Sequence, residues 1–277
     1  FDVNMGGLLN VLELARERDL RVFSPSSIAV FGPDVPSEAP QDSVLHPTTM
    51  YGMTKVAGEL LADYYAQAQG VDVRGLRYPG LISWRTPPGG GTTDYAVAIF
   101  HSAVQGMPYT CFVRADTRLP MMYMDDAIRA TLDIMDAPAE RLTCPASYNL
   151  AAVSFRADEL AAEIASRVPG FEVHYVPDHR HAIADSWPDA VVDTVARAAG
   201  GRDPARFFFF LFVCFFLHFY LVLSACCICF VLLCFFLFFC VCCSLFFFVA
   251  LFLFVLLSLS VSVFLSLCLS VCLSVCL

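Results

Sequence analysis

The chain of 277 residues divides near Arg206 into two segments of unlike composition. Residues 1–206 hold every Asp, Glu, Lys and Arg and therefore the whole net charge of −9, whereas residues 207–277 hold none. This acidic balance argues against nucleic acid or an anionic membrane surface as the main partner of the first segment. Its two cysteines, Cys111 and Cys144, are isolated and fit neither a disulfide framework nor a zinc site.

The first segment predicts helices that alternate with short strands. Capping residues and following glycines predict helices at about 4–19, 49–69, 93–105, 125–136 and 154–168, the first of them capped by Asn4. Apolar runs predict strands at 21–24, 71–78, 121–124, 148–150 and 171–176, with loops at 32–47 and 79–91. Such an alternation is typical of an α/β fold with a parallel sheet that is covered on both faces.

Tyr51 and Lys55 lie four residues apart on the long helix predicted over 49–69, and hence on one helical face. A free tyrosine is a poor base at neutral pH, but a cation held nearby favours the phenolate form. The lysine can also hydrogen-bond a ribose hydroxyl. Ser26 and Ser27 end a predicted strand upstream, where a hydroxyl could hold the oxygen of a substrate. Because a Tyr-x-x-x-Lys pair also arises by chance on helices, the flanking segments must support the assignment.

Two flanking segments resemble the extended short-chain dehydrogenases, a group with a Rossmann-type doubly wound parallel sheet. They are Val-Phe-Ser-Pro-Ser-Ser-Ile-Ala-Val-Phe-Gly at 22–32 and Leu-Arg-Tyr-Pro-Gly at 76–80. The segments at 77–83, 88–96, 117–126 and 177–188 are similar, more narrowly, to the short-chain L-threonine 3-dehydrogenases. Gly-Gly-Gly-Thr-Thr-Asp-Tyr and Ala-Asp-Ser-Trp-Pro are the most specific of these motifs, and the resemblance runs from about residue 2 to about residue 200.

This resemblance implies oxidation of the 3-hydroxyl of L-threonine to 2-amino-3-oxobutanoate, with NAD⁺ as the cofactor that is reduced. It assigns Tyr51 as the group that takes the hydroxyl proton, Lys55 as its support and Ser27 as the group that orients the substrate. The remaining roles are substrate binding by Ser27, Tyr51, Thr92 and Trp187, and cofactor binding by Ser26, Tyr51, Lys55 and Leu81. The resemblance to animal enzymes implies a mitochondrial location and leaves a homodimer open.

The sequence departs from the family pattern at both ends. The family opens with a strand and a Gly-x-x-Gly-x-x-Gly turn that binds the pyrophosphate of the cofactor, and neither precedes Phe1. We therefore expect residues 1–206 to form an incomplete Rossmann-type sheet, with the first strands missing, that lacks activity by itself. Beyond Arg197 the match fades at Gly-Gly-Arg-Asp-Pro.

Residues 207–277 form a low-complexity tail composed mostly of Phe, Leu, Val, Ser and Cys. Uncharged apolar runs longer than about 18 residues are candidates for membrane spans. Flanking basic residues and an aromatic belt are lacking, which favours a translated non-coding repeat over a membrane anchor. A disulfide scaffold is the least favoured of the three interpretations. A membrane partner is thus expected only if the tail is genuinely translated.

Two alternatives to threonine oxidation stay open. One is a nucleotide-sugar epimerase or dehydratase on the same scaffold, and the other is a membrane-tethered pseudoenzyme. Three further features have ambiguous roles. Arg118 could bind a substrate carboxylate or an internal acid, Asp125 and Asp126 fit a helix N-terminus, and His179 and His181 favour surface roles over a metal site.

Overall fold

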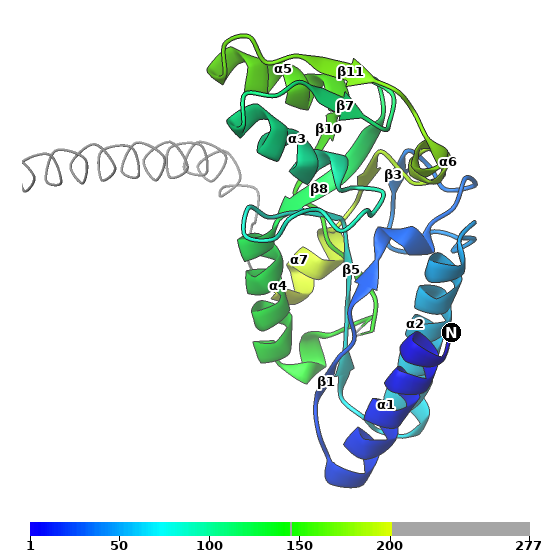
Figure 1. Cartoon of the computed structure of the whole chain (residues 1–277). Helices are drawn as coiled ribbons and strands as arrows, with labels where there is room; N and C mark the ends of the chain where they lie inside the picture. The colour runs from blue at the N-terminus through cyan, green and yellow to red at the C-terminus, as the bar shows by residue number, and fades with distance from the viewer. Residues whose placement is uncertain (145, 201–277) are drawn as a thin grey trace, which may run out of the picture. The chain divides into compact units, whose positions relative to one another are not determined.

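The computed structural model of the chain describes residues 1–144 and 146–200 (Figure 1). The expectations for the tail at 207–277 lie outside these described residues. Among the described helices, none combines the length and the apolar character that crossing a bilayer requires.

The described residues form an alternation of helices and short strands. The helices are α1 (Gly7–Arg18), α2 (Met50–Ala68), α3 (Tyr95–Val104), α4 (Met124–Asp136), α5 (Ala157–Arg167), α6 (His179–Ala184) and α7 (Thr194–Gly200), with shorter turns η1 (Asp2–Gly6), η2 (Ile28–Val30) and η3 (Ala139–Arg141). The strands are β1 (Val22–Phe23), β2 (Ser26–Ser27), β3 (Glu38–Ala39), β4 (Val73–Arg74), β5 (Leu76–Tyr78), β6 (Gly80–Ile82), β7 (Tyr109–Cys111), β8 (Arg118–Tyr123), β9 (Tyr148–Asn149), β10 (Val153–Arg156), β11 (Val173–Tyr175) and β12 (Ala190–Val191).

The central strands are parallel. β1 pairs with β4. The strands that follow these two in the sequence, β2 and β5, also pair with each other, and β5 pairs on its other side with β9. Gly75 separates β4 from β5, and a Cβ atom there would lie 2.3 Å from the carbonyl oxygen of Ala146 and 2.6 Å from that of Ser24. The neighbouring backbones therefore approach too closely for a side chain at this position.

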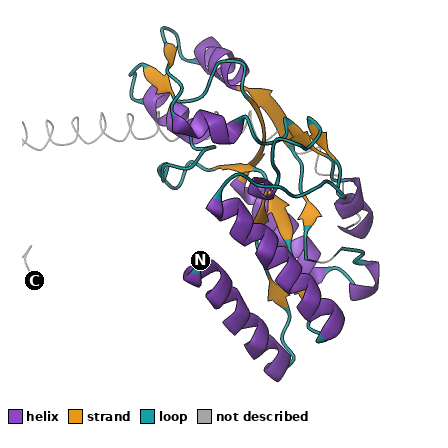
Figure 2. Cartoon of the chain, turned by 90° about the vertical axis from the view of Figure 1, so that its right-hand side faces the viewer, coloured by secondary structure: helices purple, strands orange, loops and turns teal. Residues whose placement is uncertain are grey.

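Helices cover both faces of these strands, with α1 and α2 on one side and α4 and α7 on the other (Figures 1 and 2). Beneath α1 and α2 lies a core of Leu12, Ala15, Val22, Ala62, Tyr65, Val71, Val73 and Ala146. Beneath α4 and α7 lies a core of Leu76, Met122, Ala127, Ile134, Tyr148, Leu150 and Ala199. This arrangement confirms the expected α/β fold of the Rossmann type.

A smaller group of elements follows the central strands. β8 pairs in parallel with β6 and antiparallel with β10, and β7 pairs in parallel with β11. α3 and α5 cover this group, at the top of Figure 1.

Four local predictions from the sequence were wrong. The segments at 32–47 and 79–91, expected to be loops, contain β3, which pairs with β12, and β6, which pairs with β8. The helix expected from residue 154 begins only at Ala157, because Val153–Arg156 pairs with β8. Asn4 caps no helix, because it lies inside η1 and its side chain donates to Thr54 Oγ1 on α2. In each case a partner distant in sequence overrides the local preference.

Candidate active site

The first turn of α2 carries Tyr51 and packs against η2, the turn that follows Ser27. Thr49 caps the helix, and its hydroxyl accepts a hydrogen bond from the Gly52 amide at 3.0 Å. A Cβ atom on Gly52 would lie 2.2 Å from the carbonyl oxygen of Ala29 and 2.6 Å from Pro47 Cβ. The absence of a side chain at Gly52 therefore lets Tyr51 approach the segment that carries Ser27.

Lys55 lies one turn after Tyr51, as its spacing predicts. Its Nζ atom is 5.6 Å from the centroid of the Tyr51 ring and donates to the carbonyl oxygen of Pro25 at 2.7 Å. Burial lowers the pKa of Lys55, and the negative charge of Glu59 partly offsets that effect. The ammonium is thus held between α2 and the chain that enters β2, with its charge within about 6 Å of the phenol ring, the range of a cation–π contact.

Ser26 and Ser27 form β2, and their hydroxyls have different partners. The Ser27 Oγ atom accepts a hydrogen bond from the Ala29 amide at 3.2 Å, at the start of η2. The Ser26 hydroxyl is buried and donates to Glu59 Oε1. Ser27 is therefore the one whose hydroxyl hydrogen remains for a substrate oxygen, whereas the hydrogen of Ser26 is used within the protein.

A buried ion pair contacts β2. Arg77 on β5 donates to both carboxylate oxygens of Glu59, at 2.9 Å and 2.7 Å. Both side chains are only 5% exposed. Arg77 also donates to Asn149 Oδ1 and to the carbonyl oxygen of Gln41, both at 3.1 Å. The sequence analysis overlooked Glu59, although its position four residues after Lys55 places it on the same helical face.

Thr92 lies in the glycine-rich loop before α3 and is half-buried. The Asp94 carboxylate shapes this loop, because its Oδ2 atom accepts hydrogen bonds from the amides of Gly90 and Gly91 at 2.7 Å and 2.8 Å. Gly90 has a φ of +96°, a conformation that favours glycine. Asp94 is thus a positioning residue that the sequence analysis did not single out, although an Asp three residues after a glycine run is a recognisable signal.

Trp187 follows α6 and packs against the cluster formed by Ile28, Val30, Phe31, Ala39 and Val191. Ile28 is the residue directly after Ser27, so Trp187 shares a cluster with the turn that follows the predicted substrate-binding serine. A contact of 3.3 Å between Ser186 Oγ and Thr48 Oγ1 joins the same segment to the start of α2.

Leu81 lies on β6, opposite Met122 of β8, and packs against the core beneath α4 and α7. Shared contacts connect Ser27, Tyr51, Lys55 and Trp187, whereas Leu81 packs beneath α4 and α7 and Thr92 lies in the loop before α3.

Arg118 has an internal partner. It donates to both carboxylate oxygens of Glu159, at 2.9 Å and 3.1 Å, and to the carbonyl oxygen of Ser154. The internal acid is therefore the partner that the structure supports for this arginine. Asp125 and Asp126 lie in the first turn of α4, but neither side chain caps the helix, because its N-cap residue is Tyr123 and no side chain makes a capping hydrogen bond there. Within residues 1–144 and 146–200, no group of three or more His, Cys, Asp or Glu side chains could hold a metal ion.

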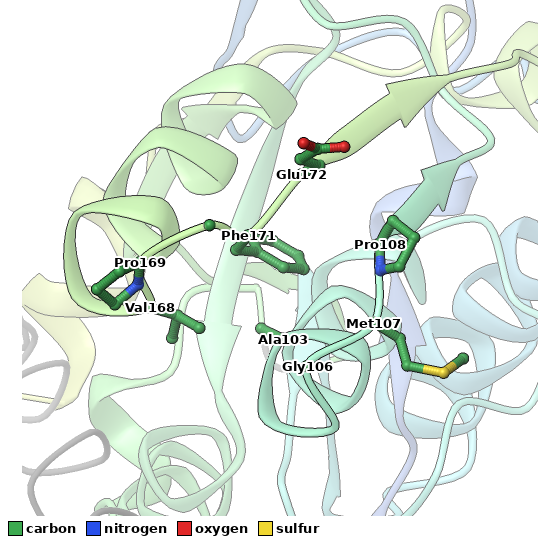
Figure 3. Close-up of a pocket in the computed structure, with 9 residues that line it drawn as sticks. Ala103, Gly106, Met107, Pro108, Val168, Pro169, Phe171 and Glu172 are labelled. Carbon is green, nitrogen blue, oxygen red and sulfur yellow. The ribbon is translucent and has the colours of Figure 1, made fainter.

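A separate pocket lies on the smaller group of elements, where the turns after α3 and α5 meet (Figure 3). In Figure 3, Phe171 points between Val168 and Pro108. The lining residues are Ala103, Gly106, Met107, Pro108, Val168, Pro169, Gly170, Phe171 and Glu172. None of the site residues predicted from the sequence lines this pocket.

Comparisons with known proteins identify the family of the chain. Residues 1–151 match the model of the NAD dependent epimerase/dehydratase family. An uncharacterized epimerase/dehydratase of Staphylococcus haemolyticus is 50% identical over 206 residues, which cover 74% of this chain and 65% of that protein. The mitochondrial L-threonine 3-dehydrogenase of Bos taurus is 51% identical over 201 residues, which cover 72% of this chain and 54% of that protein.

Among solved structures, the holo form of a GalE-like L-threonine dehydrogenase from Cupriavidus necator is similar, with a TM-score of 0.72. The two are 57% identical, and the match covers 73% of this chain and 66% of that one. The chain therefore spans less than two thirds of the length of the two curated relatives.

Proposed function

The chain belongs to the NAD-dependent epimerase/dehydratase family, and we propose that its protein is an oxidoreductase that oxidises L-threonine at the 3-hydroxyl. The product is 2-amino-3-oxobutanoate. The observation that carries this proposal is the 51% identity to a threonine 3-dehydrogenase over 201 residues, which are 72% of this chain. The arrangement of Tyr51, Lys55 and Ser27 around β2 and α2 supports it.

NAD is the cofactor of this family, and the residues present fit it. An ammonium group carries three N–H donors, and the contact of Lys55 with the Pro25 carbonyl uses one of them, which leaves donors for ribose hydroxyls. Leu81 offers an apolar neighbour for the nicotinamide end. Because the Ser26 hydroxyl donates to Glu59, its role in cofactor binding would have to use other atoms. When bound, NAD⁺ would accept the hydride that leaves C3 of the substrate.

The protein's own residues would accept the proton of the substrate 3-hydroxyl. The Tyr51 phenolate takes the proton of the substrate 3-hydroxyl, and the Lys55 ammonium, 5.6 Å from the ring, stabilises the negative charge before that transfer. Ser27 holds the substrate oxygen by a hydrogen bond. Thr92 and Trp187 would contact the amino-acid end of the substrate. The hydroxyl proton leaves the oxygen for Tyr51, the hydrogen on C3 leaves with its bonding electrons, and a C3=O double bond forms.

Two further proposals concern the location and the assembly of the protein. The bovine relative is mitochondrial, which supports a mitochondrial location, and import of the complete protein into isolated mitochondria tests it. A homodimer is the proposed assembly, and light scattering of the purified protein tests it. Recovery of this protein in the cytosol after cell fractionation would contradict the proposed location. A monomeric mass would contradict the proposed homodimer.

The proposed reaction is tested by measuring NADH formation with L-threonine and, in a separate assay, the conversion of UDP-glucose into another nucleotide sugar. The chain of 277 residues is assayed beside a form extended ahead of Phe1 by the corresponding part of the Cupriavidus necator enzyme, because the match covers 66% of that enzyme. We expect threonine-dependent NADH formation by the extended form and no reaction with UDP-glucose. Conversion of UDP-glucose without threonine oxidation would favour a nucleotide-sugar epimerase or dehydratase instead.

A further inference from the structure

Helix α2 contacts the β2 segment at two successive points. Lys55 Nζ donates to the carbonyl oxygen of Pro25 at 2.7 Å, and one helical turn later Glu59 accepts the hydroxyl hydrogen of Ser26. Pro25 and Ser26 directly precede Ser27. Two side chains on one face of α2 therefore hold the two residues that lead into the predicted substrate-binding serine.

Glu59 is itself fixed from the opposite side. The guanidinium of Arg77 binds both of its carboxylate oxygens, and Arg77 is held in turn by Asn149 on β9 and by the carbonyl oxygen of Gln41. A buried ion pair of this kind is weak support for stability, because removing two charges from water offsets much of their attraction. The ion pair also places the Glu59 carboxylate one helical turn from Lys55, where its charge can act on the ammonium.

The charge of Glu59 acts on Lys55. Burial lowers the pKa of the Lys55 ammonium, and Glu59 is the charged group that raises it. An ammonium that lost its proton near neutral pH would no longer stabilise a phenolate on Tyr51. The carboxylate therefore opposes the effect of burial where the proposed chemistry needs a cation.

We propose that Glu59, held by Arg77, is a positioning residue of the active site: it fixes the segment that carries Ser27 against α2 and places a carboxylate one helical turn from the Lys55 ammonium. This inference rests on the proposed function only in that Tyr51 and Lys55 are taken as the catalytic pair. Glu59 itself touches neither substrate nor cofactor and acts through Lys55 and Ser26.

The charged groups around Glu59 define what else could act on Lys55. Asp63 lies one turn further along α2, and its pKa is raised by burial and by the like charge of Glu59, and lowered by Arg77. Two charged groups on neighbouring elements bind residues other than Lys55 and Glu59: Glu13 of α1 accepts a hydrogen bond from Tyr65 of α2, and Arg74 of β4 binds Asp72. Asp63 is thus the matched control for a charge on this face of the helix.

The composition of the chain makes a direct test possible, because Lys55 is the only lysine among its 277 residues. Labelling the full chain with ¹³C,¹⁵N-lysine gives one lysine side-chain signal in an NMR spectrum, and its shift with pH reports the pKa of Lys55. The titration needs neither substrate nor cofactor. Its outcome is therefore independent of whether threonine is the substrate.

We expect Glu59→Gln to lower the pKa of Lys55, because burial then acts without an opposing charge. Asp63→Asn, which removes a carboxylate one turn further from Lys55, leaves that pKa at its original value, as does Ser26→Ala, which keeps the carboxylate. A purely structural role for Glu59 predicts loss of stability in Glu59→Gln with no change in the Lys55 titration. An unchanged or raised pKa in that variant would overturn the proposal.

Glu59→Gln leaves Arg77 buried without its counter-ion and could prevent folding. The double variant Glu59→Gln/Arg77→Met avoids this, because it removes both charges and keeps an acceptor for the Ser26 hydroxyl. The Lys55 pKa must fall in this variant too, and an unchanged value would equally overturn the proposal. If the pKa falls as expected and the extended form does not oxidise threonine, the proposed function fails and the positioning role of Glu59 stands.

Discussion

Two buried arginines lie on successive segments of one strand run, Arg74 on β4 and Arg77 on β5, and their partners differ in kind. Arg74 is 0% exposed and binds the Asp72 carboxylate at the protein rim. Its guanidinium also donates to three carbonyl oxygens at the end of α4, those of Ile134, Met135 and Ala137. These are the carbonyls that a helix leaves without partners at its C-terminus.

Arg77 binds a buried carboxylate instead. Its partner Glu59 lies on the helix that carries Tyr51 and Lys55, and both arginine and glutamate are almost fully buried. The two arginines thus separate two tasks along one strand run. The amino end binds the free carbonyls at the end of a helix, whereas the carboxyl end, where ligands bind in open α/β sheets, carries the proposed active site.

The largest expected effect is at the carboxyl end. Tyr51→Phe should lower threonine turnover by about 10²–10⁴-fold, the usual contribution of a general base, when it is measured in the extended form. Its free energy of unfolding should stay unchanged, because Tyr51 is 51% exposed. Tyr64→Phe is the matched control, since Tyr64 is 53% exposed on the same helix and should lose no turnover. Similar turnover in both variants would remove Tyr51 from the mechanism.

The next effect belongs to the amino end. Arg74→Met should lower the free energy of unfolding by about 2–4 kcal/mol in urea titrations, because each buried carbonyl left without a donor costs about 1–3 kcal/mol. Arg21→Met serves as the control. Arg21 binds Asp72 and the Met135 carbonyl from an exposed position, so its loss should cost less than about 1 kcal/mol. Equal losses in the two variants would contradict the anchoring role of Arg74.

A third test concerns the contact between α2 and η2. Gly52→Ala should cost about 1–3 kcal/mol of stability, because its Cβ atom would lie 2.2 Å from the backbone oxygen of Ala29. Gly58→Ala on the same helix is the control. Its Cβ atom would meet only the end of the flexible Leu8 side chain, at 3.3 Å, and alanine favours helices. If both substitutions prove equally harmless by thermal unfolding, the close approach is not required.

The smallest effect is a dependence on pH at the amino end. The hydrogen bond from Arg74 lowers the pKa of Asp72, with a further contribution from Arg21 and an opposing effect of burial. A depressed folded-state pKa adds stability above the unfolded-state value, and that stability is lost as the pH falls through the folded-state value. Asp72→Asn should therefore cost about 1 kcal/mol or less near pH 7 and nothing in strong acid. A difference that grows on acidification would have the wrong sign.

Local signals in the sequence predicted the helix that matters most. The helix predicted at about 49–69 agrees with α2, which spans Met50–Ala68, and the i, i+4 spacing correctly places Tyr51 and Lys55 on one face. β6 and β10 escaped prediction because strands of three and four residues are specified by their pairing with β8 rather than by their own composition.

The environment of the site was less predictable than its residues. Glu59 owes its burial to Arg77 and Ser26, which come from other elements, so its role depends on tertiary contacts that no local pattern encodes. Arg118 illustrates the same limit. Its sequence context was equally compatible with a substrate carboxylate, and only the antiparallel pairing of β8 with β10 brings Glu159 within reach.

The most direct test of the central claim uses L-threonine that carries deuterium at C3. If the carboxyl end of the strands binds threonine and Tyr51 takes its 3-hydroxyl proton, the extended form must transfer the label from C3 to NAD⁺. We predict one deuterium in each NADH formed. In Tyr51→Phe, the rate at which labelled NADH forms should fall together with turnover. NADH without deuterium, or labelled NADH formed at an undiminished rate by Tyr51→Phe, would contradict the account.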